Sequence, residues 1–396
     1  MMMNKKNNNG PIPFNAQILP LFLLTFIFFL NFTIRIIISP LLPGISEDMN
    51  LTQDQAGSFF LISASGYCIA LLCSGFVSSA FLHKKTILIA AVGSGIALIA
   101  AGLSPNPFIM RLMIFFVGMC AALYIPSGMA VLTTSISNRH LGKAIGIHEL
   151  APNLSFLLVP VICEGLLLFI SWRSVLVCVG MTSVIMGLCS YRFLSFQDFK
   201  GTPPMFKSFL PLMTNPSFWI MIALFSVGVA GTLGVYSMLP LYLVKEHGML
   251  QAEANTLLTL SRISTLIMPF AAGWLSDRLG VKPILICIFL ITGISTLLIG
   301  KFSGTFLKTI IFVQPIFAVS FFPPAFAALS RIGPKESGNI IVSFTIPVAF
   351  LVGGGVIPKL IGIAGDNDLF SLGFILTGLF IVSGIFLLLL LRLREE

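Results

Sequence analysis

Two arginines lie inside apolar runs that are long enough to cross a lipid bilayer. Arg35 lies deep in the first such run, and Arg262 lies fifteen residues before Asp277 in a later one. That spacing is about 22 Å along a helix, which puts Arg262 near the bilayer midplane. A charge there costs on the order of 3 kcal/mol or more, so such residues are the first functional candidates.

A guanidinium keeps its proton and binds planar oxyanions through two parallel hydrogen bonds. If Arg35 and Arg262 face one aqueous chamber, they predict binding of a carboxylate, a phosphate or a nitrate-like anion. The alternative is structural: each arginine is paired with a helix carbonyl or with an acidic neighbour.

A histidine and a glutamate adjoin in another apolar run, as His148 and Glu149, and Asn153 follows one helical turn after Glu149. Because buried Glu and His side chains can titrate near neutral pH, the pair predicts proton coupling through Glu149, assisted by His148. Glu149 also lies barely two turns after Lys143, so a gate or a salt bridge at the membrane surface is the alternative.

Neutral polar side chains in the apolar runs are further candidates for contact with a substrate: Asn31, Tyr67, Tyr124, Tyr236 and Gln314. Tyrosine also anchors helix packing and membrane interfaces, so a structural role is equally compatible. Outside the apolar runs there is no metal-ligand cluster, phosphate loop or Ser-His-Asp arrangement. We therefore expect no enzymatic activity, no cofactor and no metal.

The composition explains what must position these residues. Of 396 residues, 57% are hydrophobic and only 9% are charged, and the mean hydropathy is +1.02. Helices of roughly 17–25 apolar residues, each crossing about 30 Å of hydrocarbon, account for such a sequence. The net charge of +9 is scattered between apolar runs, which argues against nucleic acid and for contact with membrane lipid.

Counting apolar runs predicts an all-α membrane protein with twelve transmembrane helices. The longest polar interval contains Lys200, Gly201 and a Pro-Pro pair and separates six runs from six. We therefore expect five parts: an N-terminal tail (1–15), a first six-helix bundle (16–194), a linker (195–216), a second six-helix bundle (217–391) and a C-terminal tail (392–396).

The basic residues predict the topology. With the N-terminus inside, fifteen of the 23 Lys and Arg residues fall in cytoplasmic segments, while the first outer loop is acidic, with Glu47, Asp48 and Asp54. We expect a monomer in a bacterial inner membrane with both termini in the cytoplasm.

The two halves of the sequence repeat. A shift of 197 or 198 residues superposes three pairs in particular: Pro43 on Pro240, Gly75 on Gly273, and Lys84 on Lys282. Parallel six-helix repeats are a recurrent transporter architecture in which the substrate binds near the middle of the membrane, between the repeats.

The segment Gly273–Lys282, GWLSDRLGVK, resembles the signature loop after the eighth helix of the major facilitator superfamily. The resemblance implies a conformational gate formed by Gly273, Asp277, Arg278 and Lys282. The matching first-half segment, GFVSSAFLHKK, has Ser79 where that family has an aspartate. The residues around Arg35 are similar to the anion:cation symporter branch, in which the first helix carries an arginine.

These features favour a secondary transporter that moves a small organic or inorganic anion by alternating access, coupled to protons or to sodium. One alternative is an efflux pump for an amphipathic drug or metabolite, since 37 phenylalanines could line an aromatic cavity. An alternative of another class is a membrane receptor or scaffold that does not transport.

Overall fold

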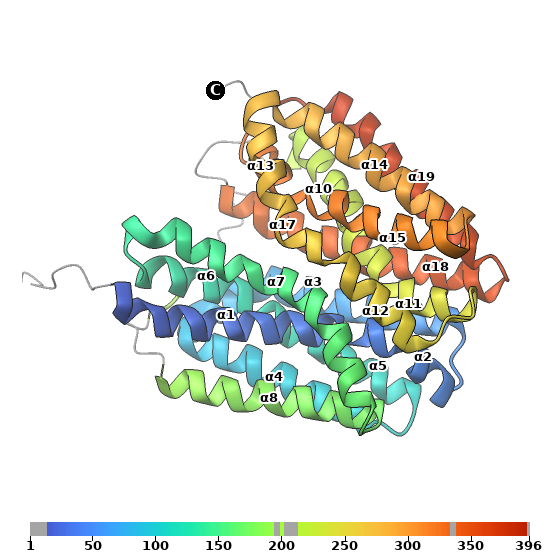
Figure 1. The fold of residues 1–396 in the computed structure, drawn as a ribbon. Helices are drawn as coiled ribbons and strands as arrows, with labels where there is room; N and C mark the ends of the chain where they lie inside the picture. Colours follow the sequence, from blue (N-terminus) through green and yellow to red (C-terminus); the bar gives the residue numbers. More distant parts are fainter. Residues whose placement is uncertain (1–13, 194–198, 202–212, 333–337, 394–396) are drawn as a thin grey trace, which may run out of the picture.

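The chain folds into helices long and apolar enough to cross a membrane. The computed structural model describes residues 14–193, 199–201, 213–332 and 338–393, and twelve segments within them qualify as membrane spans (Figure 1). The prediction of twelve transmembrane helices is confirmed. Most of the predicted tails and most of the predicted linker lie outside the described residues.

The first six spans contain the following helices: α1 (Phe14–Ile36) and α2 (Ile38–Asp48), α3 (Gln53–Ala80), α4 (His83–Gly102), α5 (Pro107–Ala122) and α6 (Tyr124–Ser135), α7 (Asn138–Leu167), and α8 (Trp172–Phe193). Polar residues fix where some of them begin. The Thr52 hydroxyl accepts a hydrogen bond from the Gln55 amide, and Asn106 caps a helix that starts with Pro107.

The last six spans contain the following elements: α10 (Pro216–Val229), η2 (Ala230–Gly234) and α11 (Val235–Lys245); α12 (Gln251–Ser261), η3 (Ile263–Leu266) and α13 (Met268–Leu279); α14 (Val281–Lys301); α15 (Gly304–Val319) and α16 (Phe322–Leu329); α17 (Gly338–Leu351), η5 (Val352–Val356) and α18 (Ile357–Asp366); and α19 (Phe370–Leu390).

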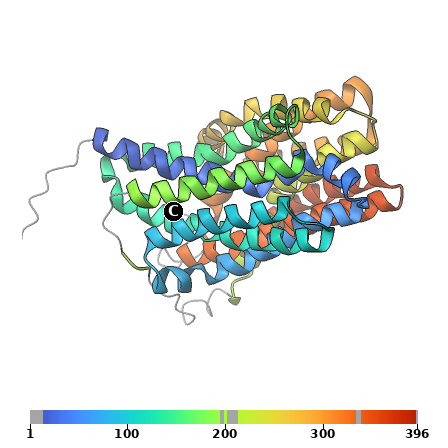
Figure 2. The same ribbon diagram turned by 90° about the horizontal axis from the view of Figure 1, so that it is seen from below.

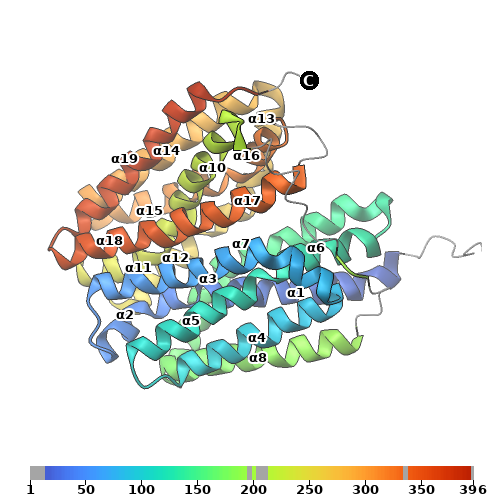
Figure 3. The same ribbon diagram turned by 180° about the vertical axis from the view of Figure 1, so that it is seen from behind.

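The spans form two bundles that lie side by side. The first bundle is coloured blue to green and the second yellow to red. The two groups of helices occupy separate regions in both of the opposite views (Figures 1 and 3). The view from below shows the helices of the first bundle running along the same direction as those of the second (Figure 2). We call the face where α1 begins and α19 ends the termini face, and the opposite face the far face.

The sequence repeat is also a repeat of helix boundaries. The helices α3 and α12 begin at Gln53 and Gln251, and α8 and α19 begin at Trp172 and Phe370, each pair 198 residues apart. Prolines and glycines lie at two of the places where spans are interrupted. Pro126 lies in the first turn of α6, and Gly353–Gly355 lie inside the π-helical η5, since proline removes a backbone donor and glycine tolerates the altered turn.

Each bundle contains the same close helix pair. A Cβ added to Gly95 of α4 would lie 2.6 Å from the Gly180 carbonyl oxygen of α8, and a Cβ on Gly180 would lie 2.6 Å from the Gly95 oxygen. One repeat later, Gly293 of α14 and Gly378 of α19 meet in the same way, at 2.8 and 2.6 Å. Only glycine allows such backbone-to-backbone contact, so both bundles depend on it.

We predict that Gly180→Val and Gly378→Val each destabilise the protein by about 3 kcal/mol, because the new side chain meets backbone atoms that cannot rotate away. Thermal unfolding of the purified protein in detergent should show a melting temperature lowered by several degrees. Gly146→Val is the matched control, since a Cβ at Gly146 meets nothing within 4 Å. Equal melting temperatures for all three variants would show that these contacts are dispensable.

Candidate functional site

The eighth span is interrupted at Arg262. The helix α12 ends at Ser261, a 3-10 turn follows, and α13 begins at Met268. The Arg262 carbonyl accepts hydrogen bonds from the Thr265 hydroxyl at 2.6 Å and from the Thr265 amide at 3.1 Å, so the break leaves this carbonyl satisfied. The guanidinium lies at the C-terminal end of α12, where the helix dipole favours a cation.

Arg35, in the last turn of α1, is surrounded by aromatic rings. Its guanidinium carbon lies 3.9 Å from the ring centroid of Tyr67, 4.8 Å from that of Phe350 and 5.2 Å from that of Phe32. Such cation–π contacts strengthen when water is excluded. Tyr67 belongs to the same bundle as Arg35, whereas Phe350 belongs to the second bundle.

Arg262 has a matching environment. Its guanidinium carbon lies 4.7 Å from the ring centroid of Phe156 and 4.9 Å from that of Tyr236, and the residue is only 3% exposed. Tyr236 belongs to the same bundle as Arg262, and Phe156 belongs to the first bundle. Each arginine therefore lies against a tyrosine of its own half and a phenylalanine of the other half.

Ring contacts connect the two arginines across the interface. The Phe32 and Phe156 rings meet edge to face with centroids 5.2 Å apart, and Phe156 meets Tyr236 at 4.7 Å. Phe32 touches Arg35 and Phe156 touches Arg262. The rings thus form one aromatic layer about midway along the spans that carry them.

Within the described residues, neither guanidinium forms an ion pair. In each arginine the Nη1 atom is buried without a hydrogen-bond partner, and so are the hydroxyls of Tyr67 and Tyr236. A buried charge without a counter-charge is costly unless other groups compensate it. Four polar groups, two in each half, could thus bind an anion directly.

The space beside Arg35 is small. A cavity of about 30 Å³ is lined by this arginine and its neighbours from both halves: Phe60, Ser63, Ala64, Tyr67, Leu233, Ser237, Phe350 and Gly354. Arg262 is not among these lining residues. About 10–15 Å³ of space open to a water-sized sphere is enough for one water molecule, so the cavity in this conformation holds roughly two waters and is too small for an organic anion.

Two predicted substrate residues bind backbone carbonyls instead of facing this cavity. The Asn31 amide donates to the Ala121 carbonyl at 3.1 Å, although its own oxygen is buried without a partner. The Gln314 amide donates to the Gly231 carbonyl at 2.7 Å and to the Thr296 hydroxyl at 3.3 Å. Gly231 lies in η2, where π-helical geometry changes the backbone hydrogen bonding.

His148 is buried between three elements of the first bundle. Its ring stacks on Phe28 at 4.5 Å, its Nε2 atom lies 3.0 Å from the Tyr124 hydroxyl, and its Nδ1 atom lies 3.3 Å from a Glu149 carboxyl oxygen. The Tyr124 hydroxyl donates to the Leu24 carbonyl at 2.6 Å. Tyr124, which the sequence predicted as a substrate contact, therefore lies against the predicted proton-coupling histidine.

The hydrogen bonds of His148 can be followed from donor to acceptor. Tyr124 has one hydroxyl proton and donates it to Leu24, so its oxygen accepts the Nε2 proton of His148. A hydrogen bond between Nδ1 and the Glu149 carboxyl then needs one further proton, carried by either group. The Glu149 side chain is 54% exposed while that of His148 is 1% exposed, so the pair extends from solvent to the bundle interior.

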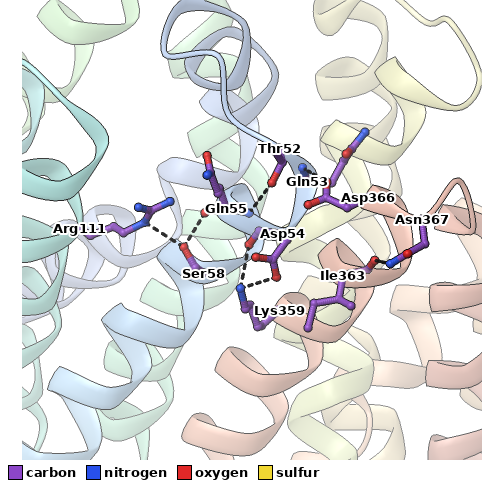
Figure 4. Close-up of polar contacts among 10 residues, drawn as sticks. All are labelled: Thr52, Gln53, Asp54, Gln55, Ser58, Arg111, Lys359, Ile363, Asp366 and Asn367. Carbon is purple, nitrogen blue, oxygen red and sulfur yellow. Dashed lines mark hydrogen bonds and ion pairs between the residues drawn. The ribbon is translucent and has the colours of Figure 1, made fainter.

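Polar contacts join the halves at the far face. Lys359 of α18 forms an ion pair with Asp54 of α3, and the backbone N–H of Gln53 donates to the Asp366 carboxylate at 2.6 Å (Figure 4). A Cβ on Gly57 would lie 2.6 Å from the Pro358 carbonyl, so α3 and α18 nearly touch there. The sequence contains the acidic and basic partners, but their separation by about 300 residues hides their pairing.

A second cross-half contact involves residues that the sequence analysis did not select as candidates. Asn255 of α12 donates to the Pro40 carbonyl at 3.0 Å and to the Glu164 carboxyl at 2.6 Å. The Ser39 hydroxyl donates to the Tyr236 carbonyl at 2.8 Å. The far-face halves of the first, fifth, seventh and eighth spans are thereby held together.

The predicted gate loop lies at the end of α13. Asp277 and Arg278 are exposed, and the Arg278 guanidinium lies 4.1 Å from the Trp274 ring centroid. The Lys282 ammonium donates to the Leu391 carbonyl at the end of α19. A Cβ on Gly273 would lie 3.6 Å from Pro323, an ordinary van der Waals distance, so close helix approach does not require glycine there.

Comparison with solved structures gives the fold a precedent. A bacterial homolog of the human lysosomal transporter Spinster, in an inward-facing and occupied conformation, superposes with a TM-score of 0.77 at 16% identity, over 96% of this chain and 97% of that one. The same homolog, inward-facing and unoccupied, gives a TM-score of 0.76.

Curated relatives are distant. An uncharacterized MFS-type transporter, YceJ of Bacillus subtilis, is 20% identical over 77% of this chain and 79% of its own length. A Na(+), Li(+), K(+)/H(+) antiporter of Planococcus maritimus is 28% identical over 34% of this chain, and a probable sulfoacetate transporter of Cupriavidus necator is 24% identical over 40%. The last two matches cover about a third of those proteins (32% and 36%).

The family profile of the Major Facilitator Superfamily matches residues 21–260 and 234–396, which together span almost the whole described chain. This match agrees with the signature-like loop, the repeated six-span bundles and the structural neighbours. The chain therefore belongs to the major facilitator superfamily and is a multi-pass membrane protein of the secondary transporter type.

Proposed function

We propose that this protein transports a small anion by alternating access, with Arg35 and Arg262 binding the anion and a proton as the coupling ion. The observation that carries the proposal is that both arginines lie in spans, near the interface of the halves, with the Nη1 atom buried and without an ion pair in the described residues. Aromatic contacts offset part of the free-energy cost of removing an arginine from water, but they leave its Nη1 donor without a hydrogen bond.

The relative from Cupriavidus necator supports an anionic substrate, because its name identifies it as a probable sulfoacetate transporter. The relative from Planococcus maritimus, named as a cation/H(+) antiporter, supports protons as the coupling ion. We assign the coupling proton to His148 and Glu149, whose hydrogen bond needs one proton beyond those fixed by Tyr124.

We further infer that the substrate chamber opens toward the termini face and that this face is cytoplasmic. The described basic residues at this face include Lys84, Lys85, Arg192, Arg278 and Lys282, which agrees with the excess of positive charge on cytoplasmic loops. The ion pair between Asp54 and Lys359 closes the opposite face. Toward the termini face the ribbons of α1 and α6 diverge from those of α13 and α17 (Figure 1).

The aromatic layer supports a second candidate function, efflux of an amphipathic compound. Five rings contact the two arginines, and such rings would also contact an apolar ligand: Phe32, Tyr67, Phe156, Tyr236 and Phe350. Export or resistance phenotypes without any anion uptake would favour this function over the first.

We predict that Arg35→Gln and Arg262→Gln each reduce anion counterflow in proteoliposomes by roughly 10- to 100-fold, since a hydrogen bond to a charged group contributes about 1.5–3 kcal/mol. The anions to test are sulfoacetate, phosphate, nitrate and short carboxylates. Arg111→Gln is the matched control, because Arg111 also lies over a phenylalanine, Phe59, but near the far face. Full uptake by both variants would exclude the assigned role.

We predict that Glu149→Gln abolishes proton-driven accumulation of the anion while leaving its counterflow, because glutamine keeps the shape but cannot release a proton. Internal pH, measured with a trapped dye during uptake, should change with the native protein and stay constant with the variant. Glu47→Gln, at an exposed glutamate near the far face, is the control. Unaltered proton movement in Glu149→Gln would assign coupling to other residues.

A further inference from the structure

The two halves contribute the same pair of polar groups to the aromatic layer. The first half supplies Arg35 and Tyr67, whose guanidinium carbon and ring centroid lie 3.9 Å apart, and the second supplies Arg262 and Tyr236, at 4.9 Å. In both pairs the arginine Nη1 and the tyrosine hydroxyl are buried without hydrogen-bond partners. Each pair therefore offers N–H and O–H donors at one location, which is the requirement for binding one oxyanion.

The two pairs are separate. Phe32 lies 5.2 Å from the Arg35 guanidinium carbon, Phe156 lies 4.7 Å from that of Arg262, and the two rings contact each other at 5.2 Å. The two arginines are thus linked through a pair of apolar rings. A single carboxylate that binds one pair leaves the donors of the other pair unsatisfied.

Charge leads to the same conclusion. Two guanidiniums carry two positive charges, and within the described residues neither has a carboxylate to neutralise it. A monovalent anion would leave one of these charges uncompensated in a region of low dielectric, whereas a divalent anion would neutralise both.

We propose that the substrate carries two acidic groups joined by a short apolar segment. One acidic group binds Arg35 and Tyr67, the other binds Arg262 and Tyr236, and the apolar segment packs on Phe32 and Phe156. This inference rests on the proposed function, since it assigns the class of anion to the same two arginines. In this arrangement the substrate contacts both halves at once. The bound molecule therefore links the two bundles, which move relative to each other in the proposed transport cycle.

The test compares acids that differ only in the second charge. Binding of dicarboxylates of three to six carbons to the purified full-length protein is measured by calorimetry, next to monocarboxylates of the same carbon number. We expect the best dicarboxylate to bind roughly 10- to 100-fold more tightly than its monocarboxylate, as expected for one additional charge-assisted contact.

Variants then identify the two binding pairs. Arg35→Gln and Arg262→Gln should each lower the affinity for the dicarboxylate to that of the monocarboxylate. Tyr67→Phe and Tyr236→Phe keep the ring and should each lower the affinity for the dicarboxylate several-fold. Tyr242→Phe is the control for the loss of a buried hydroxyl, since Tyr242 donates to the Ile299 carbonyl away from both arginines. Thermal unfolding checks that every variant is folded.

The outcomes separate this inference from the proposed function. If monocarboxylates bind as tightly as dicarboxylates and both need Arg35 and Arg262, the protein has a single-anion site and the two-acid inference is wrong, while the proposed function stands. If the folded native protein binds none of the acids, nor sulfoacetate, phosphate or nitrate, both are wrong. Loss of the dicarboxylate preference in both arginine variants but not in Tyr242→Phe supports the two-acid site.

Discussion

The stacking of two guanidiniums on aromatic rings inside the spans is the interaction on which the centre of this protein depends. Hydrocarbon tolerates a permanent cation only if something replaces its water, and here the described replacement is aromatic rather than acidic. Part of that replacement crosses the interface, because Phe350 reaches Arg35 from the second bundle and Phe156 reaches Arg262 from the first. Relative movement of the bundles would therefore change the environment of both charges, and binding of the proposed anion would change the energetic cost of that movement.

The fold was largely predictable because its two strongest signals are local. Runs of apolar residues determine the number of spans, and the 198-residue repeat carries over to helix starts and to the Gly95–Gly180 and Gly293–Gly378 contacts. The interruption at Arg262 was not predicted. The sequence from Thr259 to Thr265 contains no proline or glycine, but Pro269 follows in the first turn of α13. Because proline has no backbone N–H and clashes with the carbonyl four residues before it, Pro269 is a local signal for the break that the sequence analysis did not use.

The site was predictable in its residue types and not in its contacts. An arginine in a span can be identified from the sequence because a charge in hydrocarbon has a high free-energy cost. Phe156 and Phe350, by contrast, are two of 37 phenylalanines, and nothing in the local sequence distinguishes them from those that face lipid. Buried polar residues such as Gln314 and Tyr124 are ambiguous for a related reason. A side chain that binds a substrate and one that satisfies a backbone carbonyl have the same composition and the same hydrophobic neighbours, and only the three-dimensional contacts distinguish them.

The helix α1 connects the two groups of functional candidates. Its Leu24 carbonyl binds Tyr124, its Phe28 ring stacks on His148, and its Phe32 ring contacts both Arg35 and Phe156. Leu24, Phe28 and Phe32 are spaced four residues apart and thus lie along one face of the helix. A rigid helix cannot adjust one end of that face independently of the other. On the mechanism that we propose, a change in the protonation of His148 and Glu149 that shifts α1 would reach the ring beside Arg35, so this single helix is the route that we propose for proton coupling.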